Sequence, residues 1–127
     1  MKKEEIIKNS NYRKNLGNFG EIKATKYLKQ LGYKILLKNF VSRQGEIDII
    51  AKDKEEYVFI EVKSRSSGTY GKPVDAVNAE KIKHILDVSR YFIYKNKIDN
   101  KLIRFDIIEV YINKKNYFIN HIKNIFS

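Results

Sequence analysis

Apolar residues recur with helical spacing in two segments of this chain. Between Tyr12 and Leu31 they return every three or four residues, which is typical of an amphipathic helix, and Gly32 is placed to end it. The same spacing predicts a second helix that ends near Lys95, with Asp75 or Asn78 as its N-cap. Both helices are expected to lay their apolar sides on a sheet.

The first helix also carries small residues and one notable carboxylate. Gly17, Gly20 and Ala24 are expected to let this helix pack closely against its neighbours. Glu21 lies at the edge of the apolar stripe when positions are spaced by about 100° per residue, so its carboxylate would point along the packed face. It could reach a metal ion there, or it could be a boundary residue hydrogen-bonded to a Lys or to the backbone.

Segments rich in β-branched and aromatic residues predict the strands of the sheet. The expected strands are Tyr33–Val41, two that form a hairpin within Gly45–Arg65, Leu102–Ile112 and Asn116–Ile122. A Gly- and Ser-rich loop is expected from Ser64 to Pro73. The order α-β-β-β-α-β-β predicts an α/β fold with a mixed sheet flanked by helices.

The composition fits a single domain over residues 1–127, in which residues 1–11 form a flexible basic N-terminus. Lys and Arg number 26 against 15 Asp and Glu, and the net charge of +11 favours an anionic partner such as nucleic acid. A solvated Lys-rich surface would give the same balance. Cysteine is absent, which excludes disulfides and Cys-based zinc sites or nucleophiles. No apolar run could cross a bilayer, so a cytoplasmic protein without membrane contact is expected.

The hairpin carries charged residues at positions where a core-facing strand should be apolar. If Lys52 pairs with Tyr57 across the turn "DKEE", the antiparallel register fixes the remaining pairs. It places four side chains on one face of the sheet, with Asp48 opposite Glu61 and Glu46 opposite Lys63. Opposed like charges destabilise a sheet, so the first of these pairs needs an explanation.

A divalent cation between Asp48 and Glu61 would supply that explanation. Mg²⁺ binds a few carboxylate oxygens and fills its other positions with water and phosphate, and the Val62 carbonyl could add a further ligand. Mg²⁺ or Mn²⁺ is therefore expected as a cofactor. The alternative is a surface hairpin held by cross-strand ion pairs, such as Glu46 with Lys63.

The same residues carry a family resemblance. Asp48 at the end of one strand, with Glu61–Lys63 on the next, resembles the PD-(D/E)xK nuclease superfamily, although Ile47 stands where that motif has its proline. The segments "GNFGEIKATKYL", "RQGEIDIIAKD", "VFIEVKSR", "YGKPVDAV" and "RFDIIEV" together resemble the uncharacterised YraN-like proteins, related to Holliday-junction-resolvase-type nucleases, over Asn11 to Tyr111.

This resemblance implies a restriction-endonuclease-like fold and metal-dependent cleavage of nucleic acid, DNA in preference to RNA. Asp48 and Glu61 would hold the metal, and Glu21, at the matching "GE" position, would join them directly or through water. Lys63 would orient the attacking water or stabilise the transition state, because two nearby carboxylates raise its pKa and disfavour a role as the base. Glu46 would support Lys63 or a nearby Arg. Cleavage of a junction would call for a homodimer.

Other polar residues carry weaker signals. Contacts with phosphate are expected from Arg43, Gln44, Arg65, Lys72 and Lys81. His84 and His121 have no ligand-like spacing and are interpreted as ordinary helix and strand residues. Two other functions stay open beside the nuclease: a non-catalytic nucleic-acid-binding module that keeps the fold, and a structural protein of an RNA assembly.

Overall fold

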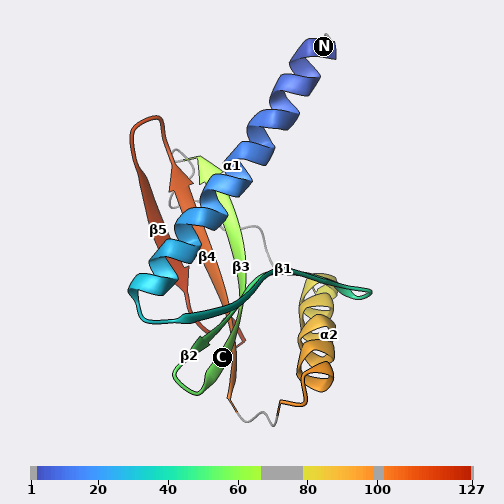
Figure 1. The fold of residues 1–127 in the computed structure, drawn as a ribbon. Coiled ribbons are helices and arrows are strands. Elements are labelled where there is room, and N and C mark those ends of the chain that lie inside the picture. The colour runs from blue at the N-terminus through green and yellow to red at the C-terminus, as the bar shows by residue number, and fades with distance from the viewer. Residues whose placement is uncertain (1–2, 67–78, 99–101, 127) are drawn as a thin grey trace.

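The computed structural model describes residues 3–66, 79–98 and 102–126, with side chains described from residue 15 onward except at positions 79 and 81. Figure 1 shows the elements in chain order: α1 (Lys3–Gln30), β1 (Lys34–Ser42), β2 (Gly45–Asp53), β3 (Glu56–Ser66), α2 (Ala79–Lys95), β4 (Ile103–Ile112) and β5 (Tyr117–Ile122). The predicted α/β class and the order of elements are confirmed. Within the described ranges, no helix is apolar over enough of its length to span a membrane.

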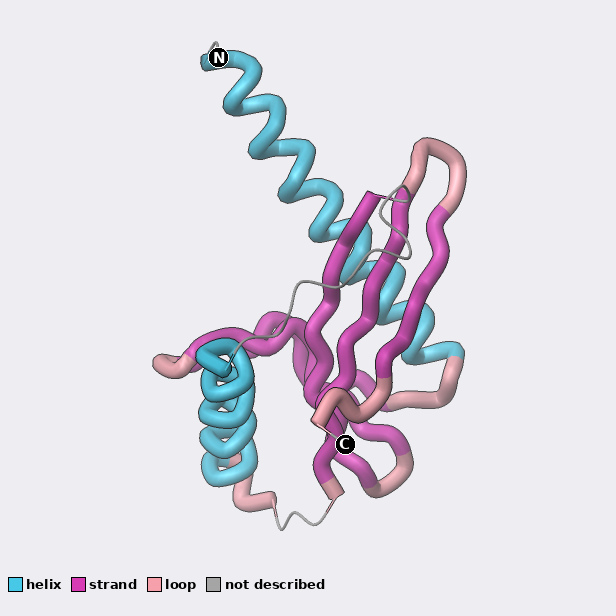
Figure 2. Tube along the Cα trace, turned by 180° about the vertical axis from the view of Figure 1, so that it is seen from behind, coloured by secondary structure: helices cyan, strands magenta, loops and turns pink. Residues whose placement is uncertain are grey.

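The five strands form one mixed sheet in the order β1-β2-β3-β4-β5. All neighbours are antiparallel except β3 and β4, which are parallel and lie on either side of α2 in the chain. α1 packs across β3, β1 and β4, whereas α2 packs on β2. Figure 2 shows α1 passing behind the strands, while α2 stands beside the sheet.

Alternation along the strands sends side chains to two separate apolar clusters. Ile49 and Ile60 join the cluster beneath α1, and their neighbours Ile50 and Phe59 join the cluster beneath α2. All four side chains are almost fully buried. The sheet is therefore covered on both faces in its central part, which explains why β2 and β3 are so rich in isoleucine and aromatic residues.

Two boundaries differ from the sequence-based prediction. α1 begins at Lys3 and not at Tyr12, so it includes most of the segment that was expected to be a flexible N-terminus. No Gly or Pro interrupts residues 3–11, and a helix already nucleated extends readily through such a sequence. β3 continues to Ser66 because it pairs with β4 through Ser66 and Ile112, so the predicted loop does not begin at Ser64. The remainder of that loop, up to Pro73, lies outside the described residues.

α1 approaches the sheet most closely at Gly20. A Cβ atom at Gly20 would lie 1.9 Å from Ser64 Oγ and 3.2 Å from Ser64 Cβ, so only glycine fits between helix and strand there. Ala24, one turn further along, is fully buried in the cluster beneath α1. The close-packing role predicted for Gly17 is wrong, because Gly17 is exposed and a Cβ there would meet no atom within 4 Å.

The β2–β3 hairpin follows the predicted register only over its first half. The paired residues run from Asp53 with Glu56, through Lys52 with Tyr57, to Ile49 with Ile60. Beyond Ile49, β2 continues beside β1 as far as Gly45, and its pairing with β3 has ended. The predicted cross-strand pair of Asp48 with Glu61 is therefore wrong, because the two strands part at this point.

The separated end of β2 rests on α2. Gly45 has a φ of +148°, a conformation that side chains disfavour, and a Cβ there would lie 3.4 Å from Val88 Cγ2 and 3.8 Å from His84 Cβ. Figure 1 shows the β1–β2 hairpin reaching across the end of α2 where that helix begins. The end of β2 thus packs beside α2 where it no longer pairs with β3.

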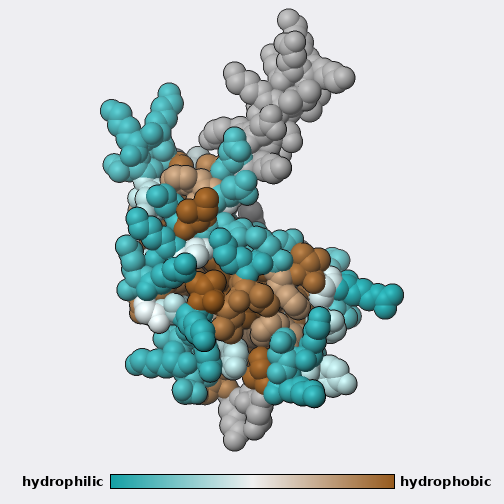
Figure 3. Space-filling model, viewed as in Figure 1, coloured by the Kyte–Doolittle hydropathy of each residue, from teal (hydrophilic) through white to brown (hydrophobic). Residues whose placement is uncertain are grey.

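β1 forms one edge of the sheet and carries exposed apolar side chains. Leu37 is 43% exposed and Val41 is 69% exposed. Figure 3 shows hydrophobic side chains gathered along the path of β1, in the middle of a mostly hydrophilic surface. A register irregularity between Ile35 and Leu37, and a left-handed Asn39 with φ of 54°, interrupt the edge. Such irregularities limit pairing of an edge strand with a foreign strand.

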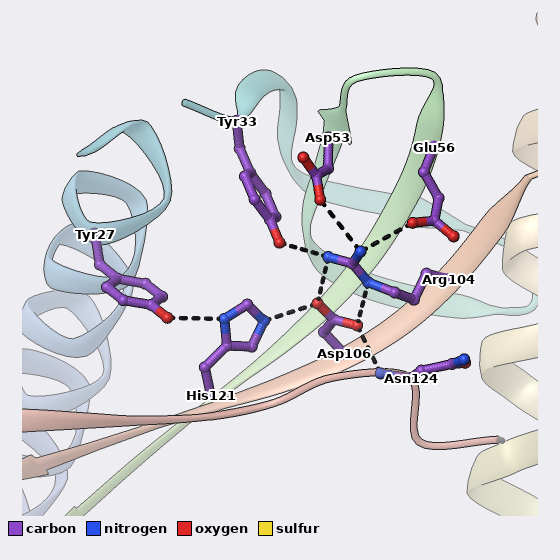
Figure 4. Close-up of polar contacts among 8 residues, drawn as sticks. All are labelled: Tyr27, Tyr33, Asp53, Glu56, Arg104, Asp106, His121 and Asn124. Carbon is purple, nitrogen blue, oxygen red and sulfur yellow. Dashed lines mark hydrogen bonds and ion pairs between the residues drawn. The ribbon is translucent and has the colours of Figure 1, made fainter. Parts of the chain in front are cut away.

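A buried polar network is centred on Asp106, which is 1% exposed (Figure 4). Its carboxylate accepts hydrogen bonds from Arg104 Nε at 3.0 Å and from the Asn124 backbone N–H at 2.9 Å, and it lies 2.7 Å from His121 Nε2. Burial raises the pKa of Asp106, but the bonds with His121, Arg104 and Asn124 outweigh it and hold the pKa below its ordinary value. The Asp106 carboxylate is therefore ionised, and its charge is compensated by these hydrogen-bond partners.

The network also reaches the beginning of the chain. Tyr27 OH lies 2.9 Å from His121 Nδ1, and Arg104 makes further contacts with Tyr33, Asp53 and Glu56. His121 is a strand residue of β5, as predicted, and its ring also joins α1 to β4 through both nitrogens. No spacing or motif in the sequence indicated the roles of Arg104 and Asp106.

We predict that Gly20→Ala lowers the free energy of unfolding by about 1–3 kcal/mol, measured by urea denaturation, because an overfilled contact forces helix and strand apart. Adding Ser64→Ala should restore part of this loss, since it removes the nearest atom. Gly17→Ala is the matched control: it should leave stability unchanged or raise it by up to about 1 kcal/mol through helix propensity. Equal effects at positions 17 and 20 would contradict the close approach.

We predict that Asp106→Asn lowers the free energy of unfolding by about 2–4 kcal/mol, because it weakens the charge-assisted contacts with Arg104 and His121, although Asp53 and Glu56 remain as ionic partners of Arg104. The control is Asp87→Asn, which removes the same charge from an exposed pair with Arg90 at 4.0 Å and should cost less than about 1 kcal/mol. Urea denaturation of both variants makes the comparison. Similar small losses would show that the network contributes little to stability.

Candidate active site

Asp48 lies where β2 leaves β3, and its side chain forms a hydrogen bond with the backbone of β3 in place of a backbone–backbone bond. The Val62 backbone N–H donates to Asp48 Oδ2 at 2.8 Å. Burial raises the pKa of Asp48 to about 6, and the negative charges of Glu61, Glu46 and Glu21 add to the rise, while the bond from Val62 opposes it. Four carboxylates, on α1, β2 and β3, therefore interact around one point.

A cavity of about 470 Å³ opens on the α1 side of Asp48. Its walls include Glu21, Glu46, Asp48 and Lys63, together with Asn39 of β1. The structure thus brings together three of the four predicted catalytic residues, although they come from α1, β2 and β3.

Glu21 is fixed by contacts to β1. Its Oε1 accepts a hydrogen bond from Asn39 Nδ2 at 2.9 Å and lies 3.9 Å from Lys38 Nζ. The side chain of Glu21 is only 19% exposed. Both alternatives from the sequence describe part of this arrangement, because Glu21 bonds to neighbouring side chains and also lines the cavity beside Asp48.

Glu61 lines a second cavity, on the α2 side of the sheet, and not the cavity beneath α1. Its Oε1 lies 3.3 Å from Lys63 Nζ, so Lys63 pairs with Glu61 and the predicted ion pair of Glu46 with Lys63 is replaced. Glu46 and Asp48 line both cavities. Glu46, Asp48, Glu61 and Lys63 therefore all lie around the place where β2 and β3 part.

The residues expected to contact phosphate are spread over several places. Arg43 and Gln44 are exposed at the tip of the β1–β2 hairpin, where Gln44 bonds to Ser42. Lys72 lies outside the described residues, as does the side chain of Lys81, whose backbone belongs to α2. Contacts with nucleic acid stay a prediction for all of them.

Arg65 bonds to a buried carboxylate that sequence analysis missed. Arg65 Nε donates to Glu109 Oε2 at 2.8 Å, and Glu109 is 1% exposed. Tyr111 OH and Asn120 Nδ2 also donate to Glu109, at 3.0 and 2.9 Å. The pattern could not have revealed this cluster, because it depends on the parallel pairing of β3 with β4.

The oxygen donors around Asp48 fit Mg²⁺ or Mn²⁺ as a partial ligand set. Among the side chains that the structure describes, no three His, Asp or Glu residues form a ready-made metal group. Mg²⁺ requires only one or two carboxylates when water and phosphate complete its shell. Burial, and after it the charges of Glu61, Glu46 and Glu21, raise the pKa of Asp48, and a bound cation would favour its ionised form. Asp48, Glu61 and the Val62 carbonyl are the residues that could hold it.

These features define a small α/β domain in which carboxylates and a lysine surround the point where two strands part. The chain belongs to the uncharacterised protein family UPF0102, whose family model matches residues 20–110. It is 47% identical over 116 residues to a UPF0102 protein of Caldicellulosiruptor saccharolyticus, covering 90% of this chain and 98% of that protein. It is 50% identical over 113 residues to one of Clostridioides difficile, covering 89% and 97%. The YraN-like family predicted from the motifs is confirmed.

We predict that Asp48→Asn stabilises the metal-free protein above pH 6. The pKa of Asp48 rises from an ordinary 3.8 to about 6 on folding, so the folded state holds a proton that the unfolded state releases between these values. The parent should therefore lose stability, up to roughly 3 kcal/mol, as the pH rises from 4 to 6. The amide keeps an oxygen for the Val62 N–H and has no such loss.

Thermal unfolding in EDTA between pH 4 and 8 measures this effect, with exposed Glu55→Gln as the charge-matched control. The Asn variant should melt several degrees above the parent at pH 8 and level with it near pH 4. Added Mn²⁺ should raise the melting temperature of the parent more than that of the variant. A lower melting temperature for the variant at pH 8 would show that Asp48 is half of a stabilising ion pair.

Proposed function

We propose that this protein is a metal-dependent endonuclease that hydrolyses phosphodiester bonds of nucleic acid, DNA in preference to RNA and branched or structured DNA in particular. The supporting observation is the Asp48 carboxylate, which is held by the Val62 N–H among three further carboxylates, with Lys63 on the same cavity wall. A protein that only binds nucleic acid gains nothing from carboxylates gathered beside a phosphate backbone.

Each residue has a role that follows from its contacts. The hydrogen bond from Val62 orients Asp48, and a pKa of about 6 leaves Asp48 mostly ionised at neutral pH. Asp48 and Glu61 would hold Mg²⁺ or Mn²⁺. When bound, such an ion lowers the pKa of a coordinated water and offsets charge on the phosphate. Glu21, fixed by Asn39, would act through a water.

Lys63 would stabilise the transition state. Its contact with Glu61 keeps its ammonium beside the carboxylates, on a wall of the cavity where a phosphate would enter. The reaction adds negative charge to the phosphoryl oxygens, and a fixed ammonium stabilises that charge more strongly than the ground state.

The charge of the chain supports a nucleic-acid substrate. A net charge of +11 attracts the phosphate backbone at long range and offsets the local repulsion of the carboxylates. Arg43 and Gln44 at the exposed hairpin tip would contact phosphates beyond the site. Paired cuts in a branched substrate need two active sites, so we expect a homodimer during cleavage and a cytoplasmic location with the chromosome.

We predict that Lys63→Ala reduces Mn²⁺-dependent cleavage of a branched DNA by at least about 100-fold, the range for loss of one transition-state contact. Binding should change only a few-fold, because Lys63 serves the transition state. Single-turnover cleavage and fluorescence anisotropy on the same substrate give the two values. Lys29→Ala, which removes an exposed lysine from the last turn of α1, is the charge-matched control and should cleave at the parent rate.

Two outcomes would change the proposal. A Lys63→Ala variant that cuts at the parent rate would show that Lys63 takes no part in catalysis. A parent protein that binds the branched DNA but leaves it intact with Mg²⁺ and with Mn²⁺ would be a non-catalytic binding module that keeps the nuclease fold.

A further inference from the structure

The cavity on the α2 side of Asp48 has the size of a small-molecule site. Its volume is about 450 Å³, within the roughly 300–1,000 Å³ typical of ligand pockets. β2 and β3 form one wall, the first turns of α2 form another, and Ile125 closes it near the C-terminus. Figure 2 shows this side of the sheet, with α2 and the β1–β2 hairpin beside it.

Flat aromatic rings form the base of this cavity. Phe59 and Phe105 both line it and stack with ring centroids 5.5 Å apart at 25°. Phe105 also meets Phe126 edge-on at 4.8 Å. Ile47 and Ile85 complete an apolar wall. A planar, largely apolar group would extend this aromatic row by stacking.

The polar side chains at this cavity are mostly carboxylates. Glu46, Asp48, Glu61 and Glu80 all line it, and an ionised carboxylate can only accept hydrogen bonds. Asp106 also lines the cavity, but its carboxylate is already engaged by Arg104 and His121, and His84 adds an imidazole. Such a rim repels a phosphate but attracts a group that presents N–H donors. Glu80 and His84 line this cavity and not the one beneath α1, so they can contact a ligand bound here.

The ligand must also be adjacent to the proposed catalytic carboxylates. Asp48 and Glu46 form part of the wall of both cavities, so a group held on the α2 side lies directly beside the opening between β2 and β3. A nucleotide meets all of these conditions at once: its base is planar, its amino group donates, and its phosphate is joined through a single sugar.

We propose that this cavity binds one unpaired nucleobase that carries an exocyclic amino group. The base stacks on Phe105, and its amino group donates to Glu80. This inference rests on the proposed function and narrows its substrate: a base must leave its stack to enter, which is least costly in single strands and at branch points. Thymine and uracil present a carbonyl oxygen in place of the amino group of cytosine, so the carboxylate rim disfavours them.

Cytidine and uridine test the pocket without a phosphate and without a metal. With the protein in EDTA, the methyl resonances of Ile47, Ile85 and Ile125 report occupation of the cavity by NMR. Cytidine should shift all three and bind more tightly than uridine, by roughly fivefold or more. Absence of shifts at millimolar cytidine, or equal binding of the two nucleosides, would overturn the proposal.

Substitutions on α2 locate the binding. Ile85→Trp fills the cavity and should abolish the shifts at Ile47 and Ile125, whereas Tyr94→Trp, on the same helix at an 84% exposed position, should leave them intact. Glu80→Gln, at an exposed position that tolerates exchange, should reduce the preference for cytidine because the amide also offers a donor. Cytidine binding that survives Ile85→Trp would place it elsewhere and overturn the proposal.

This inference and the nuclease can fail separately. If the protein binds cytidine but never cleaves nucleic acid, the nucleobase pocket is supported and the nuclease proposal is wrong. If it cleaves with metal but shows no preference between cytidine and uridine, the nuclease proposal is supported and the nucleobase pocket is wrong.

Discussion

The hydrogen bond between the Val62 backbone N–H and the Asp48 carboxylate is the constraint on which this site depends. A strand that leaves its neighbour exposes backbone groups that must find other partners. Here the partner is a side chain of the departing strand, so β2 and β3 remain joined while a space opens between them. The same bond fixes the orientation of the carboxylate that the proposed chemistry needs.

Two packing contacts flank this opening from opposite sides. Gly20 allows α1 to lie against Ser64 of β3, which brings Glu21 and Lys63 to one cavity. Gly45 allows the hairpin to lie on α2, where β2 no longer pairs with β3. The carboxylates around Asp48 lie in the space between these two contacts, although the net charge of the chain is strongly positive. Attraction at long range and repulsion at short range are thereby separated in space.

Local pattern was enough to predict the elements, the hairpin pairing of Lys52 with Tyr57 and the gathering of Glu21, Asp48 and Lys63. The elements and the hairpin depend on residues close in sequence, and the gathering of the three charged residues was expected from the resemblance to PD-(D/E)xK nucleases. The parting of β2 from β3 was not predictable, because it accompanies contacts with α2, which is distant in sequence. The network around Asp106 was missed for a similar reason, since it joins residues as distant as Tyr27 and His121, which are 94 positions apart along the chain.

The network around Asp106 has a consequence for biosynthesis. Arg104 requires Tyr33 from the start of β1, while Asp106 requires the backbone N–H of Asn124. The centre of the sheet therefore lacks its polar partners until Asn124 has left the ribosome. Strand pairs already made by then leave β3 with an exposed edge, because its partner β4 follows only after α2. The edge of β3 that faces β4 therefore stays open during synthesis until both α2 and β4 have been made.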